Sequence, residues 1–284
     1  MGNSLQKVVF RLSKKKKKPV VKAVILVFAV CLAAASVLYV FTRDKLPSLV
    51  INNLLSQEDP PLIDIPSDYI SGSGSRPTIY AKQPTVLQET TPADRAYLDN
   101  TVFIGDSRVE GMRLSGSIQP KNAYAQTGMS HVGAMTTACV DIGTGRLLTI
   151  PQAVAIRKPQ RMVVAFGING IVWMGEESFI QGYEELIDTL MKKSPNSIVI
   201  IQSILPVSSW KEQSDPRMSN QKIDRYNELL VDLAERKGIY YLNAAEKMKN
   251  SRNALDSRYD SGDGLHFNAA AGDLIVDYLL SHPV

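Results

Sequence analysis

Beyond about residue 93, short apolar runs alternate with segments whose hydrophobic positions recur every three to four residues. Short apolar runs are typical of buried strands, and the recurring positions are typical of amphipathic helices. The predicted strands are 102–104, 123–125, 162–166, 197–204 and 239–242. The clearest helical faces contain Phe179, Tyr183, Leu186, Ile187, Leu190 and Met191 in one segment, and Ile223, Tyr226, Leu230 and Leu233 in another. The alternation predicts an α/β fold with a parallel sheet and helices on both faces.

A longer apolar run near the N-terminus has a different pattern, with nineteen uncharged residues at 23–41. At about 1.5 Å per residue, a helix of this length spans about 28 Å, which matches the hydrocarbon core of a bilayer. Residues 1–22 contain eight Lys or Arg and no acidic residue, and such flanks favour the cytoplasmic side. We therefore expect a basic cytoplasmic tail at 1–22, a transmembrane signal-anchor helix at 23–42, and the remainder of the chain outside the cell membrane. A signal peptide cleaved after Ala35 is the alternative.

The segment at 43–92 is rich in proline and contains a Ser-Gly repeat at 71–75. Such a composition buries little apolar surface. We therefore expect a spacer there, followed by one folded domain at 93–284.

Charge and cysteine usage exclude some classes of function. The chain has 32 Lys and Arg against 28 Asp and Glu, but without residues 1–22 its net charge is −4. Nucleic-acid binding by the folded part is therefore not expected. Cys139 is the only cysteine outside the apolar run, so no disulfide is expected within the domain, and a small buried hydrophobe is its simplest role. No His, Cys and carboxylate spacing indicates zinc, and we expect no metal or other cofactor.

Ser107 stands where a predicted strand ends in Gly105-Asp106 and a helical segment begins. A serine at this place can be an N-cap of the helix, because its hydroxyl accepts a bond from a free amide of the first turn. It can also be a nucleophile if a base lies within hydrogen-bond reach. The local sequence leaves both roles open.

The candidate base is His266, which follows Asp263 across a glycine-containing turn. An aspartate at this spacing can bond to Nδ1 of the imidazole and leave Nε2 directed at Ser107. His131 is the second candidate base, and we expect His282 to be exposed near the C-terminus. The backbone amides of Ser107 and Gly128, with the side-chain amide of Asn169, could form an oxyanion hole, because all three residues follow predicted strand ends.

The chain from about 98 to 282 resembles the SGNH/GDSL hydrolase family. The similarity rests on four blocks in order: Gly105-Asp106-Ser107, Gly128, Gly167-Ile168-Asn169, and Asp263-Gly264-Leu265-His266. It implies a flavodoxin-like, three-layer α/β/α sandwich with a five-stranded parallel sheet. It also implies ester hydrolysis in which Ser107 is nucleophile, His266 base and Asp263 its orienting partner, with Ser107, Gly128 and Asn169 as oxyanion donors.

Two positions differ from the family pattern: Arg108 stands where the name-giving motif has Leu, and Gly170 where the family usually has Asp. We predict Arg108, His131 and Trp173 as possible substrate-pocket residues. Trp173 and Trp210 follow predicted strand ends and could stack on a sugar or anchor their loops. The hypothesis is a serine esterase that removes acetyl groups from extracellular or cell-envelope carbohydrate. An O-acyltransferase with the same triad, or a non-catalytic glycan-binding module, is the alternative.

Overall fold

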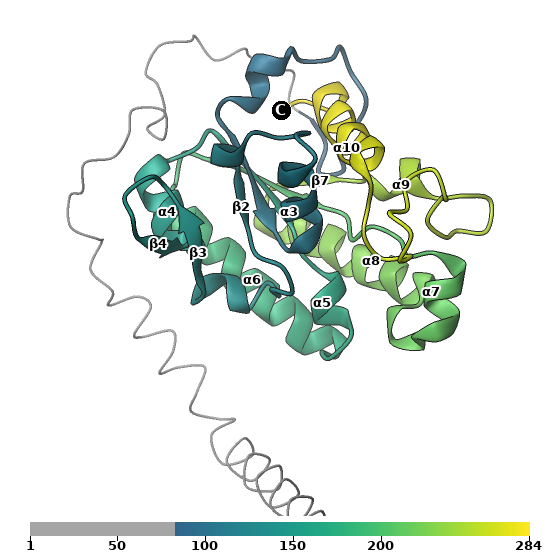
Figure 1. Ribbon diagram of the computed structural model, residues 1–284. Coiled ribbons are helices and arrows are strands. Elements are labelled where there is room, and N and C mark those ends of the chain that lie inside the picture. The colour runs from purple at the N-terminus through teal and green to yellow at the C-terminus, as the bar shows by residue number, and fades with distance from the viewer. Residues whose placement is uncertain (1–82) are drawn as a thin grey trace, which may run out of the picture. The chain divides into compact units, whose positions relative to one another are not determined.

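Five parallel strands form the centre of the structure, a computed structural model that describes residues 83–284 (Figure 1). The strands are β1 (Thr101–Gly105), β2 (Ala123–Ala125), β5 (Arg161–Ala165), β6 (Ile198–Gln202) and β7 (Tyr240–Leu242). Their order across the sheet is β2-β1-β5-β6-β7, and every neighbouring pair is parallel. This order is that of flavodoxin-like sheets. The predicted fold class and the five predicted strands are confirmed.

Helices cover both faces of this sheet and produce three layers (Figure 1). One face carries α4 (Ile150–Arg157), α6 (Glu176–Lys193) and α8 (Asn220–Lys237), and the other carries α3 (Ser107–Leu114) and α10 (Ala269–Ser281). The remaining short helices are η2 (Arg95–Leu98), η3 (Pro120–Asn122), η4 (Gly133–Met135), α5 (Ile168–Ile171), α7 (Ser209–Ser214), η5 (Pro216–Met218) and α9 (Ala245–Met248).

The sheet is buried on both sides, which explains why its strands are continuous apolar runs rather than alternating ones. All five residues of β1 are buried, and Val102, Phe103 and Ile104 are each 0% exposed. The long helices bury the faces predicted from their periodicity, namely Phe179, Tyr183, Leu186, Ile187 and Leu190 in α6, and Ile223, Tyr226, Leu230 and Leu233 in α8. Met191 is only partly buried.

Two features of the fold were not predicted. Ala138–Asp141 (β3) and Leu147–Thr149 (β4) form a small antiparallel sheet of two strands. Residues 83–92, which the sequence analysis placed in the spacer, pack on the domain: Tyr241 in β7 donates to Thr85 O at 2.7 Å and accepts from the Leu87 amide at 2.9 Å. Leu87 belongs to the core.

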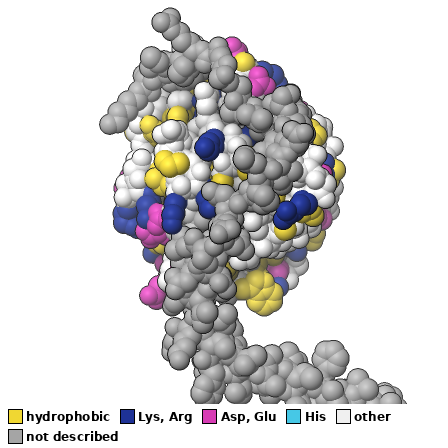
Figure 2. Space-filling model, turned by 90° about the vertical axis from the view of Figure 1, so that its left-hand side faces the viewer, with side chains coloured by type: hydrophobic (Ala, Val, Ile, Leu, Met, Phe, Trp, Pro, Cys, Tyr) yellow, Lys and Arg dark blue, Asp and Glu magenta, His cyan; other side chains and the backbone are white. Residues whose placement is uncertain are grey.

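The predicted tail, transmembrane helix and most of the predicted spacer lie outside the described residues. Residues 83–284 contain no helix that is both long and apolar enough to cross a bilayer. Figure 2 shows one face of the molecule, on which the Lys and Arg side chains of the described residues lie apart from one another among acidic, neutral and hydrophobic ones.

Candidate active site

Ser107 is the first residue of α3, directly after the turn that ends β1. Asp106 is the N-cap of this helix, and its carboxylate accepts a hydrogen bond from the Arg108 amide at 3.0 Å. A Cβ at Gly105 would lie 2.4 Å from Val109 Cγ2, so glycine lets the helix begin this close to the strand. Because Asp106 caps the helix, the Ser107 hydroxyl is not needed as a cap and can bond elsewhere.

His266 connects this serine to a carboxylate. Its Nε2 lies 3.0 Å from Ser107 Oγ, and its Nδ1 lies 2.6 Å from Asp263 Oδ2. When Nδ1 of the neutral ring donates to Asp263, Nε2 is left as the acceptor for the serine hydroxyl. The structure thus brings together the three side chains that the sequence proposed as a triad, although Ser107 and His266 are 159 positions apart.

The turn at Asp263 holds its carboxylate in place. Asp263 Oδ1 accepts from the amides of Leu265 at 2.9 Å and His266 at 2.7 Å. Burial opposes ionisation of this group, but the bonds from the His266 ring and from the two amides outweigh it and lower the pKa of Asp263 to about 2. The carboxylate is therefore charged at neutral pH and can stabilise a protonated His266 ring.

Asn169, in α5, connects the segment of Gly105-Asp106-Ser107 with the segment of Gly128. Its Nδ2 donates to Asp106 Oδ2 at 3.2 Å and to Met129 O at 3.0 Å. Met129 follows Gly128, an exposed turn residue with φ of 77°. Both amide hydrogens of Asn169 are used in these two bonds. Donation to a reacting oxygen therefore requires Asn169 to release one of them.

Asp106 contributes to several of these contacts, although no role was predicted for it from the sequence. It is 1% exposed, and its two oxygens accept from the Arg108 amide and the Asn169 side chain. Burial raises the pKa of Asp106, while the Arg108 cation and amide and the His266 ring oppose that rise. An aspartate directly before a helix is a common N-cap, which is the sequence signal for its role.

These residues lie at the carboxyl ends of β1 and β5. The strand order reverses between these two strands, since β1 is flanked by β2 on one side and β5 on the other. Ligands of open α/β sheets bind in the crevice at such a point. The candidate site is therefore at the place where the topology itself provides a binding crevice.

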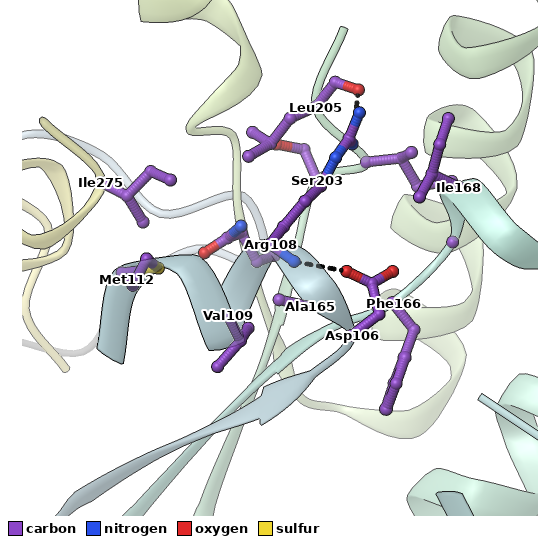
Figure 3. A pocket seen from close by; sticks show the side chains of 13 residues that line it. Asp106, Arg108, Val109, Met112, Ala165, Phe166, Ile168, Ser203, Leu205 and Ile275 are labelled. Carbon is purple, nitrogen blue, oxygen red and sulfur yellow. Dashed lines mark hydrogen bonds between the residues drawn. The ribbon is translucent and has the colours of Figure 1, made fainter. Parts of the chain in front are cut away.

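The structure contradicts the prediction of Arg108 as a substrate-pocket residue. Its side chain is buried beside Asp106 and lines a small pocket (Figure 3). Nη1 donates to Leu205 O at 2.9 Å, and Nε and Nη2 donate to Leu265 O at 3.3 and 3.2 Å. The guanidinium is therefore committed to main-chain carbonyls rather than to a substrate.

The burial of His131 contradicts the predictions that it is a second base and that it lines the substrate pocket. It is 0% exposed, and its ring centroid lies 4.6 Å from that of Phe179 and 5.1 Å from that of Tyr183. In residues 83–284 no hydrogen bond of normal geometry reaches either ring nitrogen. Burial lowers the pKa of His131 to about 4, and the Phe179 backbone opposes only part of this effect.

The His131 ring explains why position 170 is glycine here, where the family usually has aspartate. A Cβ at Gly170 would lie 2.9 Å from His131 Cε1 and 3.0 Å from Phe179 Cε2. The aromatic rings thus occupy the space that an aspartate side chain would need. Packing against these rings, rather than a carboxylate, supports the loop that carries Asn169.

His282 and Cys139 take no part in the site. The expectation that His282 is exposed was wrong, since it is 4% exposed and stacks on Tyr278 with ring centroids 3.9 Å apart. Cys139 lies in β3, partly buried and not in a disulfide, and burial raises the pKa of its thiol to about 11. A neutral thiol is a poor nucleophile. Within residues 83–284, no group of three or more His, Cys, Asp or Glu side chains is arranged to hold a metal ion.

Two exposed tryptophans lie on the segments that follow β5 and β6. Trp173 is 79% exposed, with the guanidinium of Arg217 4.9 Å from the centroid of its ring, and Trp210 is 51% exposed. A Cβ at Gly264 would lie 2.9 Å from Trp210 Cε2, so Trp210 adjoins the loop that carries His266. Trp173 is four residues beyond Asn169. Both indole rings therefore adjoin segments of the candidate site.

Comparison with solved structures finds proteins of similar structure, one of them with a TM-score above 0.5. A Streptococcus pneumonia protein described as a platelet activating factor superposes with a TM-score of 0.51 at 18% identity, covering 71% of this chain and 85% of its own. A GDSL-like lipase from Bacteroides thetaiotaomicron has a TM-score of 0.49 at 18% identity, covering 67% of this chain and 89% of its own. A family 3 carbohydrate esterase from Talaromyces cellulolyticus has a TM-score of 0.45 at 16% identity, covering 63% and 92%.

No curated protein matches the sequence. The sequence profile of the GDSL-like lipase/acylhydrolase family matches residues 103–274, which is more than half of the chain and spans every residue of the candidate site. The resemblance to SGNH/GDSL hydrolases is confirmed. The chain belongs to the GDSL-like lipase/acylhydrolase family.

Proposed function

We propose that the protein is a serine esterase whose triad is Ser107, His266 and Asp263. The observation that carries this proposal is the unbroken series from Ser107 Oγ to His266 Nε2 at 3.0 Å and from His266 Nδ1 to Asp263 at 2.6 Å. Both distances lie within or close to the range for catalytic hydrogen bonds. Family membership supports the reaction class, and the geometry supports the role proposed for each residue.

The reaction proceeds through two acyl transfers. His266 Nε2 takes the proton of Ser107 Oγ, which attacks the ester carbonyl and forms a tetrahedral oxyanion. The protonated His266 gives that proton to the departing alcohol oxygen as its bond to carbon breaks, leaving an acyl-serine. Water then loses a proton to His266 and attacks the acyl carbon, and the carboxylic acid leaves as Ser107 regains its proton.

The amides of Ser107 and Gly128 and the side chain of Asn169 are the proposed oxyanion donors. Each such donor is worth about 3 to 4 kcal/mol of transition-state stabilisation in enzymes where one has been removed. Asn169 contributes only when it releases Asp106 or Met129, to which it donates at 3.2 and 3.0 Å. The longer bond to Asp106 is the weaker of the two by its length.

For the substrate, we propose acetyl esters on carbohydrate. Trp173 and Trp210 offer exposed indole faces next to the segments that carry Asn169 and His266. Flat apolar rings with a polar edge suit the stacked faces of sugars. A basic block followed by a nineteen-residue apolar run at 1–41 supports a membrane anchor with the domain outside the cell, where envelope polysaccharide is accessible. Labelling of the domain on intact cells tests this placement, and labelling only after lysis would refute it.

The proposed chemistry predicts that Ser107→Ala abolishes ester hydrolysis. We expect the folded domain to hydrolyse p-nitrophenyl acetate and to release acetate from acetylated polysaccharide, and we expect Ser107→Ala to lose about 10³-fold or more in kcat on both. Ser214→Ala is the matched control, because the Ser214 hydroxyl is exposed and bonds only within its own helix, to Lys211 O at 2.9 Å.

Unchanged kcat in Ser107→Ala would reject the proposed nucleophile. Acetyl groups recovered on an added sugar acceptor, rather than as free acetate, would assign the same triad to an O-acyltransferase. Glycan binding without turnover in the unmodified protein, and equal binding by Ser107→Ala, would instead identify a non-catalytic module.

A further inference from the structure

Arg108 follows the proposed nucleophile directly, yet its side chain leaves the helix and reaches two distant segments. It is 9% exposed and starts in the first turn of α3. Figure 3 shows the side chain extending past Ser203 to the main chain at Leu205, while the Arg108 backbone amide bonds to Asp106. One residue therefore binds the N-cap of α3 through its main chain and the loop after β6 through its side chain.

The second segment is the loop that carries the proposed base. Nε and Nη2 of Arg108 both donate to Leu265 O, at 3.3 and 3.2 Å, and Leu265 precedes His266. Phe267, on the other side of His266, lies under the guanidinium with its ring centroid 4.6 Å from Cζ. The residues before and after His266 are thus both held by one side chain.

A guanidinium suits these contacts for reasons of geometry. Its five donors lie in a rigid plane, and here they serve the carbonyls of Leu205, Pro206 and Leu265 together. Burial lowers the pKa of Arg108 to about 10, opposed by Asp106 and Asp263, so the group remains a cation at neutral pH. A lysine has a single nitrogen and cannot reach three separated carbonyls with one planar fork.

We propose that Arg108 is a positioning residue that fixes the His266 loop relative to Ser107 and so sets the distance between Nε2 and Oγ. The activity part of this proposal rests on the proposed esterase function. The positioning part does not, because it predicts an order in the loop that is measurable without substrate.

The test compares Arg108 with another buried arginine, Arg161, at the opposite end of the sheet. Arg161 is 8% exposed, donates to Tyr97 O at 2.9 Å and Thr101 Oγ1 at 3.2 Å, and stacks on the Tyr97 ring at 3.6 Å. Arg108→Lys and Arg161→Lys each keep a buried positive charge and lose a planar fork. Only the first variant changes contacts to the loop that carries His266.

For Arg108→Lys we expect kcat on p-nitrophenyl acetate to fall about 10- to 100-fold, with KM within about threefold, because misplacement of about 1 Å can cost that much in rate. Arg161→Lys should keep kcat within about threefold at equal folded fraction. In Arg108→Ala, added guanidinium ion should restore part of the lost kcat, and ammonium ion at the same concentration should not.

Amide hydrogen exchange provides the readout that needs no activity. Exchange at residues 263–267 should accelerate in Arg108→Lys but not in Arg161→Lys. Unchanged exchange there would overturn the positioning role. If the wild type shows no esterase activity but exchange at residues 263–267 is still faster in Arg108→Lys than in the wild type, the esterase function alone is rejected and the positioning role stands. A kcat loss equal in the two lysine variants would also overturn the proposal.

Discussion

His266 and His131 have the same side chain in opposite surroundings. The His266 side chain is 40% exposed and bonds to Ser107 on one nitrogen and Asp263 on the other. His131 is fully buried among Phe179, Tyr183 and two glycines, and neither of its nitrogens has a hydrogen bond of normal geometry in the part of the chain that the structure describes.

The contrast shows which histidine is placed where it could act as a base. A general base needs a group that fixes its tautomer and a hydroxyl within reach, and only His266 has both. His131 has neither, and burial holds it neutral, with its pKa lowered to about 4. Its ring fills space against Gly170 and Gly182, as an aromatic residue would.

The largest expected effect comes from removing the Asp263 carboxylate, which bonds to His266 and has no counterpart at His131 in the described part of the chain. Asp263→Asn should lower kcat by about 10³- to 10⁴-fold, because an amide neither fixes the same tautomer reliably nor stabilises the imidazolium. Asp260→Asn is the control in the same loop, since an amide oxygen can still accept from the Gly262 and Gly264 amides as Asp260 Oδ1 does at 2.8 and 2.9 Å. Steady-state kinetics measure both. Equal losses in the two variants would show that loop integrity, rather than the triad, controls the rate.

His131 should affect stability in acid instead of catalysis. Its folded pKa is about 4, below the ordinary 6.5, so between those pH values the unfolded chain binds a proton that the folded one does not. Acidification from pH 7 to about 4.5 should therefore cost the wild type about 2 to 3 kcal/mol through this group. His131→Phe lacks this loss, and His131→Leu serves as a second variant with a smaller side chain.

Urea unfolding across this pH range measures how steeply the free energy of unfolding changes with pH in each protein. The difference between these slopes is independent of any packing cost that the substitutions carry at pH 7. We expect the folded variants to keep kcat within about fivefold, because His131 touches no member of the triad. Identical pH slopes in the wild type and both variants would contradict the assignment of a buried neutral ring.

The smallest expected effect is the coupling between His131 and Gly170. Gly170→Ala places a methyl 2.9 Å from His131 Cε1 and should destabilise the protein by about 1 to 3 kcal/mol, as overpacking does. In a His131→Ala background this cost should fall by about 0.5 to 2 kcal/mol. The relief is partial, because Phe179 Cε2 lies 3.0 Å from the same methyl position. A double-mutant cycle by urea unfolding measures it, and additivity within about 0.3 kcal/mol would contradict the explanation.

The parts of the fold that depend on local pattern were predictable. The strands β1, β5 and β6 are buried on both faces and appear in the sequence as continuous apolar runs, and α6 and α8 show their buried faces by helical periodicity. The hairpin of β3 and β4 was missed because only one of four residues in β3 is buried, so neither an apolar run nor a regular alternation marks it.

The candidate site was predictable where its chemistry depends on side-chain type and order. Ser107, Asp263 and His266 were proposed because ester hydrolysis of this kind needs a nucleophile, a base and a carboxylate, and the structure brings the three side chains together. The role of Arg108 was not accessible, because its partners are carbonyls 97 to 157 positions away, and every residue has a carbonyl. The burial of His131 depends likewise on Gly170 and Gly182, whose distant positions give no pattern in the sequence.

The central claim is that Ser107 is a nucleophile activated by His266. Intact-mass analysis after treatment with a fluorophosphonate, followed by peptide mapping, tests it most directly, because the reagent captures an activated serine without assuming any substrate. We predict one covalent adduct on the peptide that contains Ser107 in the wild type, and none in Ser107→Ala or His266→Ala. An adduct on another serine, or no adduct on the folded wild type, would contradict the account.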